Sequence, residues 1–192
     1  MAGLLKKKKR VKRGGRKYKP KTETLVVFSS NAAGLKFKVQ SLKNEIRSTK
    51  AGIFTIQETH LSKKGKLKVE NFEIFEAIRK KQKGGTVIGV HKAFKPMLIE
   101  EYSDSFELLV VEIQIRNKEI RIISGYGPQE TWKEEERLPF FQALEQEIIK
   151  AELLGKSIFI EMDSNSKLGS SMIPNDPHVQ SQKWKSFSWN NK

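Results

Sequence analysis

The chain has 192 residues, no cysteine and a formal net charge of +15 at neutral pH. This length suits one domain with a sizeable core, and the lack of cysteine excludes disulfides and Cys-ligated zinc while suiting a reducing compartment. The longest apolar runs are far too short to cross a bilayer, and the N-terminus has no hydrophobic region of a signal peptide. We therefore expect a nuclear or cytoplasmic protein with no membrane partner.

The basic charge is concentrated in residues 1–22, which hold eleven Lys or Arg and no acid. The segment has almost no apolar surface to bury, so we expect a disordered tail. Such a tail can neutralise the phosphates of a nucleic acid, act in nuclear import or serve as a solvated linker. The candidate nucleic-acid-binding residues are Lys6, Lys7, Lys8, Lys9, Arg10, Lys12, Arg13, Arg16 and Lys17.

From residue 23 to about residue 182 the composition is that of a globular domain. The sequence predicts a buried strand over 24–30, a helix over about 37–49 and a second buried strand over 53–57. The apolar residues of this helix recur at nearly helical spacing, which predicts that one face is buried. They are Phe37, Val39, Leu42 and Ile46.

Several further strands follow. The stretch "FEIFEAI" (72–78) has the period-two pattern of a half-exposed strand, and "TVIGVH" (86–91) comes after a Gly-Gly turn. The runs 107–115 and 119–126 flank Asn117 and predict a β-hairpin.

The last predicted elements are a helix and a strand. Acidic residues crowd the first turn of the helix, and Gly155 is suited to its end. Leu138, Phe141, Leu144, Ile148 and Ala151 are expected to lie along its buried face. With a final strand over 157–160, the pattern favours an α/β layered sandwich that has helices outside and mixed sheets within.

Four predicted strands have polar residues at or just after their ends. These residues are Asn31, Glu58, Tyr126 and the pair Asp163 and Asn165. Polar groups at neighbouring strand ends can meet in one cleft, where carboxylate and amide oxygens suit a hard cation such as Mg²⁺. Each residue alone also has a simpler explanation. Glu58 could begin a solvated loop, Asn31 could be a turn residue, Tyr126 a core aromatic and Asp163 a helix cap.

The order of four short motifs carries more information than any one of them. They are "NAAGL" (31–35), "IQETHL" (56–61), "SGYGP" (124–128) and "MDSNSKLG" (162–169). As a set they resemble the endonuclease/exonuclease/phosphatase superfamily, with the greatest likeness to the apurinic-type endonuclease domain of non-LTR retrotransposons. The resemblance covers about residues 24–182. It implies an α-β-β-α sandwich of mixed and antiparallel sheets, and an endonuclease that nicks DNA with Mg²⁺ (or Mn²⁺) and no small-molecule cofactor.

The resemblance also implies a role for each matching residue. Glu58 would hold the metal ion, and Asn31 would support the metal cluster. Asp163 would position and deprotonate the attacking water, and Asn165 would fix that water or the phosphate. Tyr126 would steady the scissile phosphate through its hydroxyl.

The sequence departs from the family pattern in several places. Ala33 and Met162 replace a polar residue and a glycine, and Ser164 follows the aspartate where an apolar residue is usual. The family's later aspartate and its Asp-His pair have no counterpart after residue 163. His178 belongs to a different loop motif, whereas His60 and His91 are expected to be surface or packing residues.

Residues 183–192 form an atypical tail, "KWKSFSWNNK", with two tryptophans among polar residues. Removing one base from a coding string for residues 182–192 gives Q-N-G-N-L-L-A-G-I-I, which resembles retrotransposon relatives. We hypothesise that a one-base insertion ended the domain early, against the simpler alternative of a lineage-specific C-terminus. The predicted sandwich is then incomplete at its C-terminus, and the sequence leaves open whether the chain is active.

Two other functions remain open from the sequence. The chain could be a non-catalytic nucleic-acid-binding remnant whose basic tail supplies the affinity. It could also belong to another branch of the superfamily that acts on phospholipids or inositol phosphates.

Overall fold

The computed structural model describes residues 25–62, 65, 67–78, 84–103, 106–129, 131–163 and 165. The predicted basic tail (1–22), the C-terminal tail (183–192) and His178 lie outside these residues. The described chain runs through eight strands, two α-helices and a 3₁₀ helix, in the order β1 (Val27–Asn31), α1 (Val39–Thr49), β2 (Ile53–Gln57), β3 (Phe72–Ala77), β4 (Thr86–His91), η1 (Lys92–Phe94), β5 (Met97–Tyr102), β6 (Glu107–Ile115), β7 (Lys118–Tyr126), α2 (Glu134–Leu153) and β8 (Ser157–Asp163).

The strands form two four-stranded sheets, each made from a continuous part of the chain. The first sheet has the order β1-β2-β4-β3, and the second has the order β5-β6-β7-β8. Within each sheet one pair is parallel, β1 with β2 and β7 with β8, and the other pairs are antiparallel. In both parallel pairs the connecting chain contains a helix, as a crossover between parallel strands requires.

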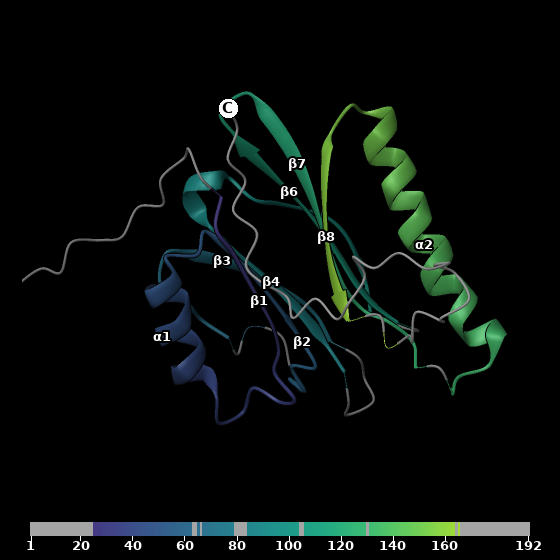
Figure 1. Ribbon diagram of the computed structural model, residues 1–192, viewed down its shortest axis with the longest axis horizontal. Helices are drawn as coiled ribbons and strands as arrows, with labels where there is room; N and C mark the ends of the chain where they lie inside the picture. The colour runs from purple at the N-terminus through teal and green to yellow at the C-terminus, as the bar shows by residue number, and fades with distance from the viewer. Residues whose placement is uncertain are drawn as a thin grey trace, which may run out of the picture.

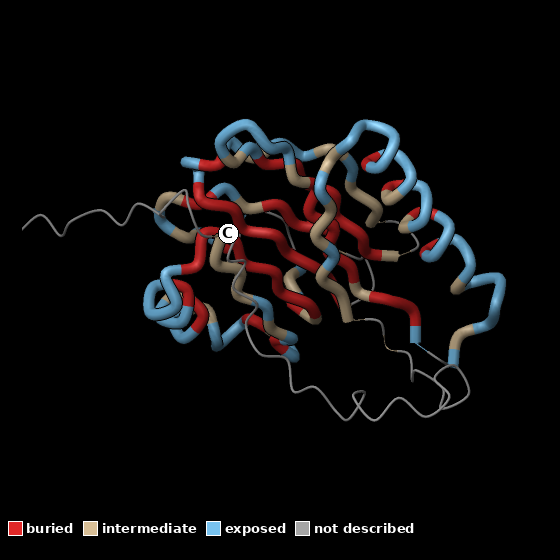
Figure 2. The backbone as a smooth tube through the Cα atoms, turned by 45° about the horizontal axis from the view of Figure 1, so that its top comes forward, coloured by how far each residue is buried: buried red, intermediate tan, exposed pale blue. Residues whose placement is uncertain are grey.

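The two sheets pack face to face, and each helix covers an outer face (Figure 1). Ile53 and Val90 of the first sheet meet Leu109 and Ile122 of the second in the central layer of the core. Buried residues run along the strands, and α2 presents most of its length to solvent (Figure 2). The result is a four-layer α-β-β-α sandwich, which confirms the predicted fold class.

A second apolar layer lies between α1 and the first sheet, where Leu42 and Ile46 pack with Phe54 and Ile56. Phe54 lies so close to β4 that a Cβ added at Gly89 would be 2.1 Å from its ring, so glycine is required there for the approach of side chain to backbone. Phe37 does not join this layer. It precedes α1 and is 89% exposed, so its predicted burial is wrong.

The buried face of α2 also differs from the prediction. Of the predicted residues, Ala151 is buried and Leu144 and Ile148 are partly buried against the core, whereas Leu138 and Phe141 are 49% and 44% exposed. Phe140, Ala143 and Glu147 are buried instead. Apolar residues surround this helix on several sides, so its sequence contains two overlapping stripes. The small Ala143 and the buried Glu147 lie on the stripe that faces the sheet.

An ion-pair network fastens α2 to the second sheet. Arg121 of β7 bonds Glu112 of β6 at 2.7 Å and Glu147 of α2 at 3.1 Å, and all three side chains are buried. Lys156 adds a contact of 2.6 Å to Glu112. Because each buried charge has a partner of opposite sign, the helix and the sheet are held in one relative position.

Candidate active site at the carboxyl ends of two parallel strand pairs

Four of the predicted site residues lie at the ends of parallel strands. Asn31 ends β1 and pairs in register with Gln57, the last residue of β2, so Glu58 follows directly beside it. Tyr126 ends β7 and pairs with Asp163, which ends β8. Parallel strands bring their carboxyl ends to the same edge, so each sheet contributes two of these residues.

Two side-chain hydrogen bonds connect β1 with β8. The amide Nδ2 of Asn31 donates to Oδ2 of Asp163 at 2.7 Å, and the hydroxyl of Ser29 donates to Oε1 of Glu161 at 2.8 Å. The partners are two residues apart on both strands, as expected for side chains on the same face of a strand. The two sheets are thus joined at the edge where the site residues lie.

A third contact joins β7 to the end of β2. The hydroxyl of Tyr126 donates to Oε1 of Glu58 at 3.1 Å. Glu58 has a φ of 49°, a left-handed conformation that costs free energy in a residue with a side chain. Hydrogen bonds of 2.8 Å from Gly34 N to Glu58 O and of 3.2 Å from Thr59 N to Gly85 O hold this backbone in place.

The environment of Tyr126 keeps its hydroxyl protonated. Burial is the main cause that raises the pKa of Tyr126, and the negative charge of Glu58 acts in the same direction. Hydrogen bonds with Gln129 and Asn165 oppose this shift in pKa. The hydroxyl therefore carries its proton at neutral pH, and in this structure it donates that proton to Glu58.

Asn165 lies against the same strand ends. Its Nδ2 donates to Gly127 O at 2.8 Å, and its backbone N donates to Oδ1 of Asp163 at 3.2 Å. Asp163 therefore accepts one hydrogen bond on each carboxylate oxygen, from Asn31 and from Asn165. These bonds fix the orientation of the carboxylate.

A buried polar cluster lies beneath these residues, between the sheets. Gln57 Nε2 donates to Ser124 Oγ at 3.3 Å, and Ser124 Oγ lies 2.9 Å from Thr86 Oγ1. Gln57 precedes Glu58, and Ser124 is two residues before Tyr126. Buried hydrogen bonds of this kind are directional, so they set the relative position of the two sheets directly below the site.

The donor set fits a hard divalent cation. Mg²⁺ takes one or two carboxylates and keeps several waters, so it needs no dense cluster of acids. Within the described ranges no group of three or more His, Cys, Asp or Glu side chains could hold a metal ion. Glu58 accepts a bond from Tyr126, and a carboxylate has further lone pairs with which to bind a cation.

The structure thus brings Asn31, Glu58, Tyr126, Asp163 and Asn165 to one edge, and their functional roles stay predictions. Ala33 lies in the same loop with a φ of 44°, and its backbone N donates to Asn31 Oδ1 at 3.0 Å.

Sequence reasoning missed Ser29 and Glu161. The signal that could have found them is their spacing, two residues before Asn31 and two before Asp163.

The two histidines in the described chain take the predicted surface and packing positions. His60 is exposed, and His91 is buried with its ring 5.4 Å from that of Phe72.

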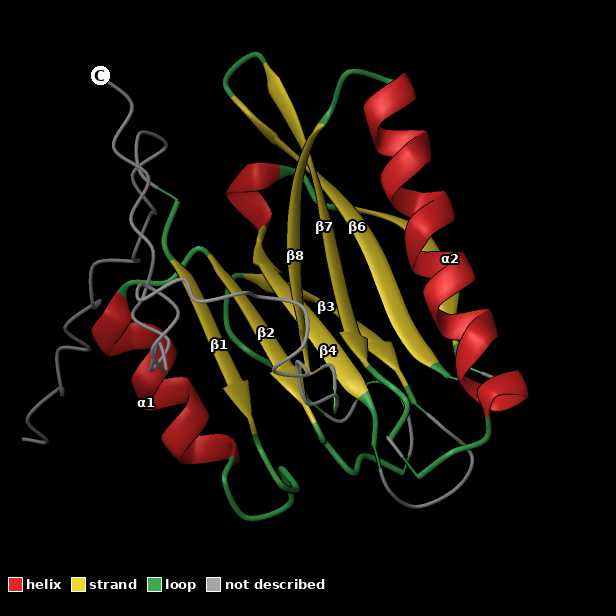
Figure 3. Cartoon of the chain, turned by 45° about the vertical axis from the view of Figure 1, so that its right-hand side comes forward, coloured by secondary structure: helices red, strands yellow, loops and turns green. Residues whose placement is uncertain are grey.

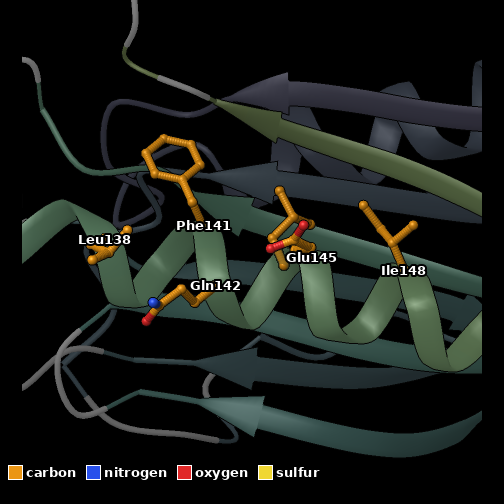
Figure 4. Close-up of a pocket in the computed structure, with 6 residues that line it drawn as sticks. Leu138, Phe141, Gln142, Glu145 and Ile148 are labelled. Carbon is orange, nitrogen blue, oxygen red and sulfur yellow. The ribbon is translucent and has the colours of Figure 1, made fainter.

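A shallow apolar depression of about 340 Å³ lies elsewhere, on α2. Its lining includes Leu138, Phe141 and Ile148, and Figure 4 shows Phe141 and Ile148 projecting from the same side of the helix. None of the predicted site residues lines it. Among the described helices, none is long and apolar enough to cross a membrane.

Comparison with known proteins gives matches at the level of structure alone. No protein-family model and no curated protein matches the sequence. The fold is similar to that of TDP2 from Caenorhabditis elegans, with 18% identity, a TM-score of 0.59 and coverage of 82% of this chain and 52% of that one. It is similar to D. rerio TDP2 complexed with a single-strand DNA product, with 15% identity, a TM-score of 0.56 and coverage of 75% and 62%.

A third similar structure is the endonuclease domain of TRAS1, a telomere-specific non-LTR retrotransposon. It shares 22% identity, a TM-score of 0.53 and coverage of 74% of this chain and 60% of that one. The chain therefore spans between 52% and 62% of the length of these three proteins. By its layers, its sheet order and these matches, the chain has the endonuclease/exonuclease/phosphatase fold.

Proposed function

We propose that this chain is a phosphodiesterase of the DNA endonuclease type, dependent on Mg²⁺ or Mn²⁺ and related to retrotransposon endonucleases. The observation that carries the proposal is the hydrogen bond between Asn31 and Asp163, with Glu58 and Tyr126 paired beside it. Two carboxylates, two amides and a protonated phenol at one edge match the donors and acceptors that hydrolysis of a phosphodiester requires.

Glu58 would hold the cation, with Asn31 supporting it. When bound, the cation acts as a Lewis acid that offsets negative charge on the phosphoryl oxygens. Manganese(II) prefers the same oxygen ligands and could replace magnesium.

The other residues would act on water and phosphate. Asp163 would accept a proton from the attacking water while the water oxygen forms a bond to phosphorus and the bond to the leaving oxygen breaks. Asn31 and the Asn165 backbone would keep the Asp163 carboxylate in position for this transfer. When substrate binds, Tyr126 would turn its hydroxyl hydrogen bond from Glu58 to a phosphate oxygen, where negative charge develops.

DNA is the proposed substrate, and residues 1–22 would add affinity that does not depend on sequence. Each phosphate that a lysine or arginine neutralises releases counterions, so this part of the affinity should fall steeply with salt. The domain between residues 23 and 182 would carry the chemistry. A nuclear or cytoplasmic location belongs to the same proposal, and it rests on the basic tail and the lack of cysteine.

Nicking of supercoiled plasmid by the purified chain tests the proposal. We expect conversion to the open-circular form with Mg²⁺ or Mn²⁺, and no conversion with EDTA. Glu58→Gln should reduce the rate strongly, because the amide removes the charge that binds the cation while preserving the shape of the side chain. Glu145→Gln, an exposed acid on α2, is the matched control and should nick like the wild type.

Two results would contradict the proposal. Nicking that persists in EDTA, or that Glu58→Gln leaves unchanged, would show that the observed activity does not come from this site. A folded sample that binds DNA without nicking it would instead favour a nucleic-acid-binding remnant. In that case deletion of residues 1–22 should abolish binding.

A further inference from the structure

Phe37 is the most exposed large apolar side chain in the described part of the chain, at 89%. It lies in the chain between β1 and α1. This connection lies at the end of the molecule where the carboxyl ends of β1 and β2 lie (Figure 3). Exposed apolar residues are common on protein surfaces, so exposure alone assigns no role. Its anchoring and its charged neighbours provide the further argument.

The loop that carries Phe37 is tied to the residues of the candidate active site. Gly34 N donates to Glu58 O at 2.8 Å, and Leu35 N donates to Thr59 O at 2.9 Å. Leu35 is buried, so the chain is fixed two residues before Phe37. Two residues span at most about 7 Å, so the Phe37 backbone lies within that distance of Leu35, which is bonded to Thr59, the residue after Glu58.

The geometry of the turn also depends on Gly34. Its φ of 94° is unfavourable for residues with a side chain, and a Cβ there would lie 3.2 Å from the His60 ring. The segment 58–60 and the loop thus pack closely. Phe37 therefore follows a turn whose backbone is hydrogen-bonded to the segment 58–60.

One positive charge lies against the Phe37 ring, and a second lies in the same loop. The Nζ of Lys36 lies 5.2 Å from the ring centroid, which is cation–π distance and leaves the opposite ring face available for another planar group. Lys38 Nζ donates to Ala32 O at 2.5 Å, which holds a second ammonium against the backbone of the residue after Asn31. An exposed aromatic ring with lysines in the same loop is the combination that binds a base and its phosphate.

We infer that Phe37 stacks on an unpaired DNA base beside the scissile phosphate, with Lys36 and Lys38 neutralising the neighbouring backbone. This inference rests on the proposed function for its substrate. In a regular duplex each base is already stacked on both faces. A protein ring can therefore stack on a base only where the DNA is single-stranded or opened. The chain therefore prefers DNA that contains unpaired nucleotides near the cleavage position.

Fluorescence anisotropy in EDTA tests this preference without cleavage. The probes are a labelled single strand of about 12 nucleotides and the same sequence as a duplex, both at one fixed salt concentration. Phe37→Ala should weaken single-strand binding by roughly 5- to 150-fold, the range for loss of one aromatic stacking partner. Phe37→Trp should retain the affinity, and duplex binding should change little in either variant.

Phe141→Ala is the matched control, because Phe141 is also partly exposed but lies on α2 away from the site. Unchanged single-strand affinity in Phe37→Ala would overturn the inference, and so would equal losses for single strand and duplex.

The plasmid assay separates this failure from failure of the proposed function. Nicking that depends on Glu58, without any effect of Phe37 on binding, would reject the stacking role alone. Phe37-dependent binding without nicking would reject the nuclease and leave the stacking site standing.

Discussion

At the scale of a single residue, the side chain of Asn31 joins the parts of the candidate site that the two sheets contribute. Its Nδ2 donates to Asp163, and its Oδ1 accepts from Ala33 N, so both ends of the amide are held. The side chain is exposed, which means that it contributes little apolar burial. Its removal should therefore affect activity more than folding.

We predict that Asn31→Ala lowers the nicking rate by about 10²- to 10³-fold, as for the loss of one positioned hydrogen-bond donor. Its free energy of unfolding should change by only about 1–2 kcal/mol, the contribution of two exposed hydrogen bonds. Rates on plasmid and urea denaturation provide the two measurements. Asn44→Ala, at an exposed asparagine on α1, is the control, and a wild-type rate in Asn31→Ala would rule out its proposed role.

The sequence could predict that Asn31, Glu58, Tyr126 and Asp163 meet, because each ends or follows an apolar strand and parallel strands end at one edge. It could not predict which of them would pair. Those pairings depend on how the two sheets dock, and nothing local in the sequence encodes that contact. Spacing alone could indicate Glu161 as a candidate, but its pairing with Ser29 could not be predicted, because Ser29 lies on the other sheet.

At the scale of one element, two adjacent phenylalanines of α2 differ in burial. Phe140 is fully buried and meets the Phe106 ring edge-on at 5.6 Å, whereas Phe141 is 44% exposed beside the shallow depression. The pair provides an internal comparison, because both positions have the same residue type in the same helix.

We predict that Phe140→Ala destabilises the protein by about 3–5 kcal/mol, through lost burial and the cavity that remains. Phe141→Ala should cost about 1 kcal/mol or less, since much of its ring already contacts water. Urea denaturation of both variants measures the difference. Equal losses would show that the helix face has been assigned wrongly.

The sequence could predict where α2 begins and ends but not which face it buries. Its apolar residues form more than one stripe, and the choice between them depends on Glu147, which is buried because Arg121 pairs with it. The strand β5 was not predicted, because "MLIEEY" has acids within the run and an irregularity in pairing between Leu98 and Glu100. Both elements are decided by partners distant in the sequence.

At the scale of the whole molecule, the Arg121 network connects the second sheet to its outer helix. Burial pushes the pKa of the Glu112 carboxyl upward, but hydrogen bonds from Lys156 and Arg121 outweigh it, and the pKa lies below its usual value of 4.5. A lowered pKa means that the ionised carboxylate of Glu112 is more stable in the folded state than in the unfolded state. The resulting stability is present above pH 4.5 and is lost as the pH falls through the lowered pKa.

We predict that Glu112→Gln is less stable than the wild type at neutral pH, and that this difference shrinks as the pH falls below about 4.5. Urea denaturation at a series of pH values measures it. Glu119→Gln serves as the control, because this carboxylate also contacts Lys156 but its side chain is 59% exposed. A difference that stays constant with pH would exclude the carboxylate as the source of the acid sensitivity.

The order of the two sheets along the chain has a consequence for biosynthesis. Each sheet is built from consecutive strands, yet Asn31 and Asp163 are separated by 132 residues and bond across the sheets. A ribosome delivers the metal-binding half of the proposed site long before the residue that would activate water. A nascent chain that stops before β8 lacks Asp163 and cannot assemble the site, so under the proposed function it should not nick DNA.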